Sequence, residues 1–110
     1  MTEVQLVRIK IREGQRQKWL DWCEESKRRG DEVLETLKSE GVISESCFLS
    51  EDENAVYYFM EAKDFKKAYE AYGRSTFPID RENKAIHEAA LDHDTAVEFK
   101  VLFSFRAPEK

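Results

Sequence analysis

The chain opens with an alternation of polar and apolar residues over residues 4–11. Val7, Ile9 and Ile11 fall on one face of this segment, and Arg8 and Lys10 fall on the other. A period of two is typical of a β-strand that has one face in a core. Gly14 interrupts the pattern, so we expect the strand to end before it.

Helical spacing follows over residues 15–40, where one stripe recurs every three or four positions. The stripe consists of Trp19, Trp22, Cys23, Ser26, Gly30, Val33, Leu34 and Leu37. We expect one long helix that ends at Gly41, with Trp22 in the core and Trp19 nearer the edge. A glycine inside a helix costs on the order of 1 kcal/mol relative to alanine. A bend over the sheet, the close approach of another backbone, or room for a ligand would explain Gly30.

Two further strands are expected at residues 42–50 and 55–62, because both runs are rich in apolar residues and the polar stretch EDEN separates them. That arrangement is typical of a β-hairpin. Residues 64–73 then have the pattern of a short amphipathic helix, with Asp64 as its N-cap and Gly73 at its end.

A second helical segment, over residues 78–92, carries both histidines of the chain close to several acidic residues. Pro78 gives it a stiff entry, Asp80 is its expected N-cap, and His93 would lie at its C-terminal end. Residues 96–105 alternate again and predict the last strand, with 106–110 as a tail.

These elements predict an α+β fold of the order β-α-β-β-α-α-β, contained in a single domain over residues 1–110. Such an order is typical of a ferredoxin-like, four-stranded antiparallel sheet with its helices on one face. The third strand is apolar on both sides, because Tyr58 and Met60 point one way while Tyr57 and Phe59 point the other. An exposed aromatic face is rare on monomers. We therefore expect a homodimer through the uncovered sheet face. A monomer with a partly hydrated face remains the alternative.

The charge pattern narrows the function classes. The net charge is −5, and basic residues are interspersed with acidic ones. No basic face is dense enough for nucleic acid or an acidic membrane. No apolar run approaches the length of a membrane span, so a cytoplasmic location is expected. Cys23 and Cys47 have no metal-binding spacing and are expected to be two buried thiols in a reducing compartment.

The segments VRIKIREGQRQKWLDW, VYYFMEAKD and FPIDRENK, in this order of elements, resemble a family of unknown function in the dimeric α+β barrel group of ferredoxin-like proteins. The resemblance covers nearly the whole chain and implies a homodimeric α+β barrel. The wider group includes cofactor-free monooxygenases, haem-degrading enzymes, sugar mutarotases and stress-responsive modules. The resemblance also implies that residues 78–92, the first helix and the sheet enclose a cleft for small molecules.

His87 is the candidate for proton transfer, because imidazole alone titrates near neutral pH without help. It lies four residues after Asn83, at the border of the helix's apolar face. A lone histidine in such a place is more often an ordinary, partly exposed surface residue, and we favour that interpretation. His87 and His93 are six residues apart and would not share a helix face, so no metal site is expected. No cofactor is expected either, since the chain has no phosphate loop or nucleophile elbow.

Two hypotheses remain open. In the first, the chain is a homodimeric small-molecule-binding protein or cofactor-independent enzyme. Its site residues would be His87 for catalysis, and Trp22, Tyr58, Arg74 and Asn83 for ligand binding. In the second, it is a non-catalytic dimeric module for binding, stress response or regulation, in which these side chains only pack. A deep, partly polar cleft would favour the first hypothesis, and a filled core with His87 in solvent would favour the second.

Overall fold

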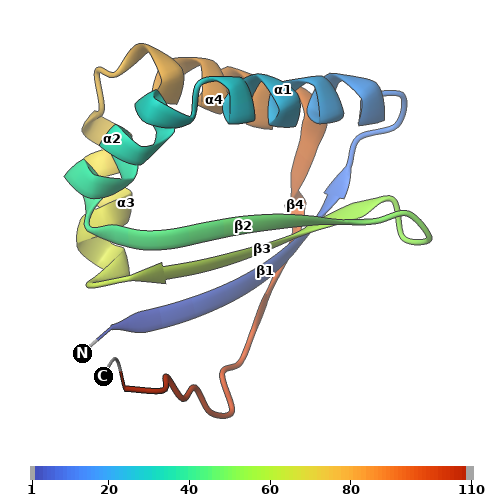
Figure 1. The fold of residues 1–110 in the computed structure, drawn as a ribbon. Coiled ribbons are helices and arrows are strands. Elements are labelled where there is room, and N and C mark those ends of the chain that lie inside the picture. The colour runs from blue at the N-terminus through green and yellow to red at the C-terminus, as the bar shows by residue number, and fades with distance from the viewer. Residues whose placement is uncertain (1, 109–110) are drawn as a thin grey trace.

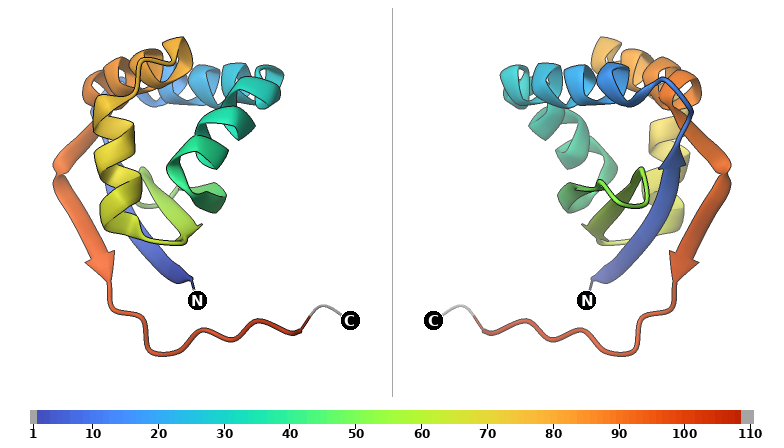
Figure 2. Two further views of the ribbon diagram at one scale, coloured as in Figure 1. Left: turned by 90° about the vertical axis from the view of Figure 1, so that its left-hand side faces the viewer. Right: turned by 90° about the vertical axis from the view of Figure 1, so that its right-hand side faces the viewer.

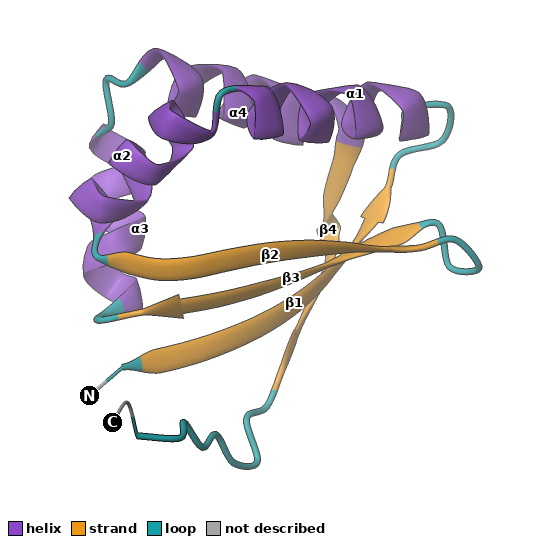
Figure 3. Cartoon of the chain, viewed as in Figure 1, coloured by secondary structure: helices purple, strands orange, loops and turns teal. Residues whose placement is uncertain are grey.

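The structure is a computed structural model that describes residues 2–108. The strands are β1 (Glu3–Ile11), β2 (Val42–Ser50), β3 (Ala55–Ala62) and β4 (Leu91–Phe99). The helices are α1 (Arg16–Arg28), α2 (Gly30–Glu40), α3 (Phe65–Arg74) and α4 (Pro78–Ala90). All strand pairs are antiparallel, and the strand order is β2-β3-β1-β4. All four helices lie on one face of the sheet (Figures 1 and 3).

The main core lies between the two central strands and the helices. Ile9 of β1 pairs with Val56 of β3, and both side chains are buried against α1 and α4. Ile79, Ala90 and Leu91 complete this cluster from the α4 side. A second cluster of Val42, Ala62 and Ala68 lies under α2 and α3. The alternation in the sequence separated the two faces of β3, and the inner one is the face that carries Val56, Tyr58 and Met60.

The single helix expected over residues 15–40 is two helices that meet at Arg29. Arg29 has φ −102° and ψ 35°, outside the helical region, and α2 begins at Gly30. A methyl group at Gly30 would meet no atom within 4 Å, so a close backbone approach does not explain this glycine. Gly30 follows the bend, where α1 runs along the sheet and α2 turns down toward it (Figure 1), but its φ is not positive, so the bend does not require a glycine either. Leu34, expected on the core face, is 65% exposed after the bend.

Ion pairs stabilise the bend. The Arg29 guanidinium donates to Glu32 at 2.9 Å and to Glu82 of α4 at 2.7 Å. The second contact joins the start of α2 to a helix that is distant in sequence. Because Arg29 is held from both sides, the break has a defined geometry.

Trp19 is more deeply placed than expected. Its side chain is 2% exposed and that of Trp22 is 8% exposed, so both belong to the core. The prediction that Trp19 lies nearer the edge was wrong. Trp19 packs edge-on against Tyr58 and His87, with ring centroids 6.1 and 5.0 Å apart.

The two later helices differ in how they begin. Asp64 caps α3 as predicted, accepting a hydrogen bond from the Lys67 amide at 3.1 Å. Asp80 does not cap α4. That helix begins at Pro78 after Phe77, whose extended backbone is the conformation favoured before proline. Asp80 lies within the first turn and accepts a hydrogen bond from the Ser75 hydroxyl at 2.5 Å.

The last strand begins and ends earlier than expected. α4 ends at Ala90, and β4 starts at Leu91, which is fully buried and pairs with Ile11. His93 therefore lies on a strand and not at a helix end. Residues 100–108 have no regular structure, although their sequence alternates, and from the end of β4 they run back across the molecule on the side of the sheet away from the helices (Figure 2). Arg106 in this tail contacts Glu61 of β3.

The outer face of the sheet carries aromatic residues, and none of the described helices covers it. Tyr57 stacks on Phe99 with ring centroids 6.1 Å apart. On β2, Phe48 is the cross-strand partner of Tyr57. Phe48 is 58% exposed, and Val97 and Phe99 are also well exposed. In the described residues, no helix is long and apolar enough to cross a membrane.

Candidate functional site

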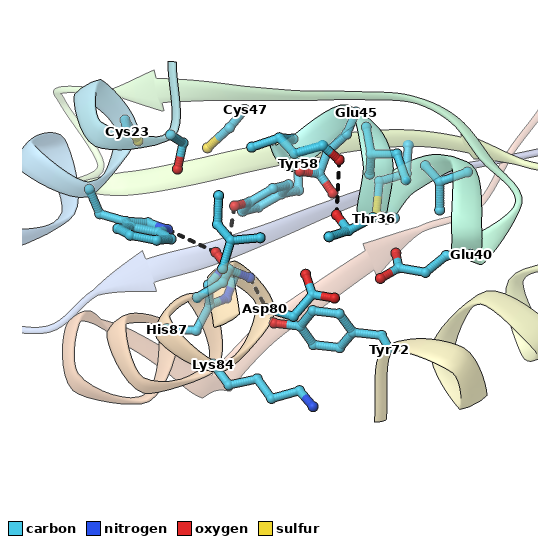
Figure 4. Close-up of a pocket in the computed structure, with 18 of the residues that line it drawn as sticks. Cys23, Thr36, Glu40, Glu45, Cys47, Tyr58, Tyr72, Asp80, Lys84 and His87 are labelled. Atoms are coloured by element: carbon cyan, nitrogen blue, oxygen red, sulfur yellow. Dashed lines mark hydrogen bonds between the residues drawn. The ribbon is translucent and has the colours of Figure 1, made fainter. Parts of the chain in front are cut away.

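A cavity of about 800 Å³ lies between the inner face of the sheet and the helical layer. The bend at Arg29 turns α2 toward one end of the cavity, where α3 also lies, and α1 and α4 cover the other end. Much of its wall is apolar or aromatic. Those lining residues include Trp19, Trp22, Val33, Leu37, Val42, Tyr58, Met60, Tyr69, Tyr72 and Ile79. Polar side chains converge on the cavity from several elements (Figure 4).

Three of these polar groups form a chain on one wall. The Tyr58 hydroxyl lies 3.3 Å from Nε2 of His87, and Nδ1 of His87 lies 3.4 Å from Nε2 of His93. Burial lowers the pKa of His87 to about 4, and the neighbouring His93 contributes in the same direction. Burial also raises the pKa of Tyr58 well above its ordinary value. Near neutral pH, a neutral imidazole therefore faces a neutral phenol, an arrangement that can pass a proton.

A second set of hydrogen bonds fixes Asn83. The Trp22 indole donates to Oδ1 of Asn83 at 2.8 Å, and Nδ2 of Asn83 donates to the Tyr72 hydroxyl at 2.7 Å. Burial raises the pKa of Tyr72 to about 12. Lys84 lies over the Tyr72 ring, with Nζ 4.8 Å from the ring centroid. The amide of Asn83 is thus held in one orientation between α1 and α3.

The end of the cavity near α2 is rich in carboxyl groups. Burial, with the charges of Asp80 and Glu45 nearby, raises the pKa of Glu40 to about 8. Burial and Asp80 also raise the pKa of Glu45. Carboxyl groups that are partly withdrawn from bulk water and lie near one another favour protonated forms, which can donate hydrogen bonds as well as accept them. This end of the cavity can therefore bind polar groups of a ligand.

The structure brings together four of the five residues predicted for the site. Trp22, Tyr58, Asn83 and His87 all line the cavity. Arg74 does not: it is the exposed last residue of α3 and lies outside the lining. His87 is half-buried on the cavity wall, and the favoured interpretation of it as a partly exposed residue without a catalytic role stays a prediction.

The two histidines also lie closer than their sequence separation suggested. The prediction kept them apart because it placed both on one helix, whereas His93 lies on β4 and contacts His87. Within residues 2–108, no group of three or more His, Cys, Asp or Glu side chains is arranged to hold a metal ion.

Several lining residues were not identified from the sequence. Thr36 and Glu40 follow Val33 at helical spacing, so the stripe of α2 contained a signal for both. Cys47 shares the inner face of β2 with Glu45, which a period of two would have indicated. The expectation of two buried thiols was also inaccurate, because Cys23 is half-buried and Cys47 is exposed.

The fold is shared with solved structures of low sequence identity. A putative antibiotic biosynthesis monooxygenase from Bacteroides thetaiotaomicron aligns with a TM-score of 0.66 and 15% identity, over 99% of this chain and 95% of that one. An L-rhamnose mutarotase from Formosa agariphila aligns with a TM-score of 0.61 and 18% identity, over 94% and 99%. Rv0793 from Mycobacterium tuberculosis aligns with a TM-score of 0.61 and 14% identity, over 94% and 98%.

These likenesses confirm the predicted fold class, the ferredoxin-like α+β barrel with a four-stranded antiparallel sheet. By sequence, residues 2–110 match a protein family described as "Family of unknown function (DUF6176)". No curated protein matches the chain.

Proposed function

The chain belongs to DUF6176, a family of unknown function, and we propose that it is a homodimeric small-molecule-binding protein. Its ligand would occupy the cavity between the sheet and the helices. The observation that carries the proposal is the cavity itself. It has about 800 Å³ of space, aromatic walls and a few convergent polar groups. Those are the properties of pre-formed ligand sites, which are usually concave and mostly apolar.

The lining suggests the chemistry of the ligand. Trp19, Val33 and Met60 favour an apolar body, while the carboxyl groups of Glu40 and Glu45 favour hydroxyl or amine groups at one end. Trp22, Tyr58 and Asn83 are the proposed binding residues on the opposite wall. Two fold neighbours bear the names of enzymes, a putative monooxygenase and a mutarotase, which supports a role with small molecules.

A cofactor-independent enzyme is the second candidate, favoured by the contact of Tyr58 with His87 and of His87 with His93. In this candidate His87 is the catalytic base and Tyr58 relays the proton. The non-catalytic alternative has the same cavity and uses these groups only for binding. His87→Gln separates them: the enzyme loses at least about a hundredfold in rate with ligand affinity retained, whereas the binding module changes only in affinity.

The proposed homodimer forms through the outer face of the sheet. Tyr57, Phe99 and Phe48 form an apolar surface on this face. The tail adds Leu102, Phe103 and Phe105, which are among the most exposed apolar residues described. A second copy would bury both surfaces at once, and apolar area of this extent is uncommon on monomers. The proposal places this single-domain protein in the cytoplasm, where free thiols are stable.

A thermal-shift screen with a library of small metabolites tests the cavity. A ligand at 100 times its Kd stabilises the folded state by about 2.7 kcal/mol. Val33→Trp fills the cavity from α2 and should abolish the shift, while Leu34→Trp adds the same side chain at an exposed neighbour and should keep it. An equal shift in both variants, or none with any compound, would contradict the proposal.

Light scattering tests the dimer separately. The wild-type chain should have about twice its 13.0 kDa mass at low micromolar concentration. Tyr57→Glu should give a monomer because it would bury an unpaired charge, and Tyr57→Phe should remain a dimer. A wild-type protein that stays monomeric on concentration rules the dimer out.

A further inference from the structure

Both ring nitrogens of His87 have a side-chain partner. Nε2 lies 3.3 Å from the Tyr58 hydroxyl (Figure 4), and Nδ1 lies 3.4 Å from Nε2 of His93. The buried indole of Trp19 packs edge-on against the same imidazole, with ring centroids 5.0 Å apart. A ligand in the cavity therefore meets the Tyr58 hydroxyl and not a free nitrogen of His87, so His87 would act on it through a neighbour.

The three side chains belong to three elements and differ in exposure. Tyr58 lies on β3, His87 is half-buried on α4, and His93 is exposed on β4. All three line the cavity. The chain of contacts therefore runs from the inner face of the sheet to an imidazole at the surface, which can exchange protons with water.

The direction of the hydrogen bonds follows from the chemistry of the groups. An unprotonated imidazole nitrogen is a better acceptor than a phenol oxygen, so the Tyr58 hydroxyl donates to Nε2 of His87. A neutral imidazole carries a single N–H, which in His87 must then be on Nδ1 and donate to Nε2 of His93. Neutral His93 in turn carries its N–H on Nδ1. One assignment at Tyr58 thus determines the tautomers of both histidines.

We propose that His93 fixes the tautomer of His87 and is the outer end of a proton relay that connects the cavity to solvent. The proposal rests on the enzyme candidate described above, in which His87 is the base. Tyr58 is the member of the relay that contacts the ligand. His93 acts through His87 and is therefore a positioning residue.

The relay conserves protons and charge. An acidic hydroxyl of a ligand gives its proton to the Tyr58 oxygen and keeps the electron pair. The Tyr58 proton moves to Nε2 of His87, and the Nδ1 proton of His87 moves to Nε2 of His93. His93 is then an imidazolium, which releases its Nδ1 proton to water. Transfer in the reverse order returns a proton to the ligand and restores the tautomers.

NMR of protein labelled with ¹⁵N-histidine tests the tautomers without any ligand. The chain has two histidines, so His93→Gln and His93→Phe each leave His87 as the single labelled residue. In the wild type and in His93→Gln, whose amide oxygen can still accept, His87 should carry its proton on Nδ1. In His93→Phe that N–H would be unpaired, so both tautomers should be populated. A proton on Nε2 in the wild type, or one tautomer in all three proteins, would overturn the proposal.

Exchange of the His87 Nδ1 proton with water tests the outer end of the relay. His93→Gln keeps an acceptor for this proton but cannot take it up, so exchange should be at least about tenfold slower than in the wild type. Asp94→Asn, at the exposed next position of β4, is the control and should keep the wild-type rate. Equal rates in the wild type and His93→Gln, or equal slowing in both variants, would overturn the role of His93.

These measurements separate the relay from the enzyme candidate, because neither of them needs a ligand or turnover. The expected tautomer and exchange rates, without turnover of any compound that binds, would support the relay and contradict the enzyme candidate. The opposite tautomer would overturn the relay even in an active enzyme.

Discussion

The Tyr58 hydroxyl lies 3.3 Å from Nε2 of His87, and this contact joins the centre of the sheet to α4 across the cavity wall. The imidazole lies at a partly buried place, where loss of solvent disfavours its charged form. The pKa of His87 is therefore lowered to about 4. The site thus contains a group whose protonation opposes folding, which gives it a measurable signature.

The stability of the protein should fall in mild acid because of His87. Its pKa is about 4 in the folded chain and about 6.5 when unfolded, so below pH 6.5 the unfolded state binds the additional proton. Stability from this group is complete above pH 6.5 and is lost toward pH 4, at about 1.4 kcal/mol per pH unit. Urea denaturation at pH 7 and pH 5 should show a smaller difference for His87→Gln than for wild type. His93→Gln should retain most of the difference, because burial is the main cause.

Glu40 should have the opposite effect. Its pKa rises from 4.5 to about 8 on folding, so the folded state holds the additional proton and stability falls as pH rises through that range. Glu40→Gln should therefore be more stable than wild type at pH 8, by about 1–3 kcal/mol, with the difference vanishing near pH 4. Glu35→Gln, at an exposed position of the same helix, is the matched control for the substitution. A Glu40→Gln curve parallel to wild type would contradict the raised pKa.

Ser75→Ala should destabilise the junction of α3 and α4. The Ser75 hydroxyl donates to the buried carboxylate of Asp80 at 2.5 Å and accepts from the Phe77 amide at 3.2 Å. Its removal leaves Asp80 without this donor, which typically costs about 1–3 kcal/mol. Chemical denaturation measures the loss. Thr76→Ala, at the exposed next position, should change stability by less than about 0.5 kcal/mol.

Two glycines should respond in opposite ways to alanine. Gly30 begins α2 without a positive φ, and an added Cβ meets no atom within 4 Å. Gly30→Ala should therefore stabilise the protein by about 0.4–1 kcal/mol. Gly41 ends α2 with φ 75°, where an L side chain is strained, so Gly41→Ala should destabilise it by about 1–2 kcal/mol. Thermal unfolding of the pair measures both effects. A loss of stability in Gly30→Ala would contradict the account of the bend.

The parts of the fold that could be predicted were those set by local periodicity. The alternation of β1 and β3 and the cap at Asp64 needed no knowledge of the rest of the chain. The break at Arg29 did need it, because Glu82, which holds the guanidinium, belongs to a distant helix. The same is true of β4: Leu91 is in a strand since it pairs with Ile11, and the alternation after Phe99 has no described strand beside it.

The residues of the candidate site also fall into those that local periodicity could predict and those that it could not. Asn83 and His87 were recognisable from their spacing on one helix, and Glu40 had a signal in the stripe of α2. The contact of His87 with His93 joins α4 to β4, so helix periodicity could not reveal it. Arg74 was selected for its charge alone, and nothing in the periodicity of α3 required it to face the cavity.

Tyr57 and Tyr58 are neighbours on β3, yet one faces the outer aromatic surface and the other faces the cavity. Alternate residues of β3 therefore contribute to the two surfaces. A substitution at either tyrosine affects one surface, but an inserted or deleted residue within β3 would exchange them over the rest of the strand. Phe59 would then enter the cavity, and Met60 would move to the outer face. In descendants of this chain, insertions and deletions should therefore accumulate in the Ser50–Ala55 turn and in the tail, while the length of β3 stays constant.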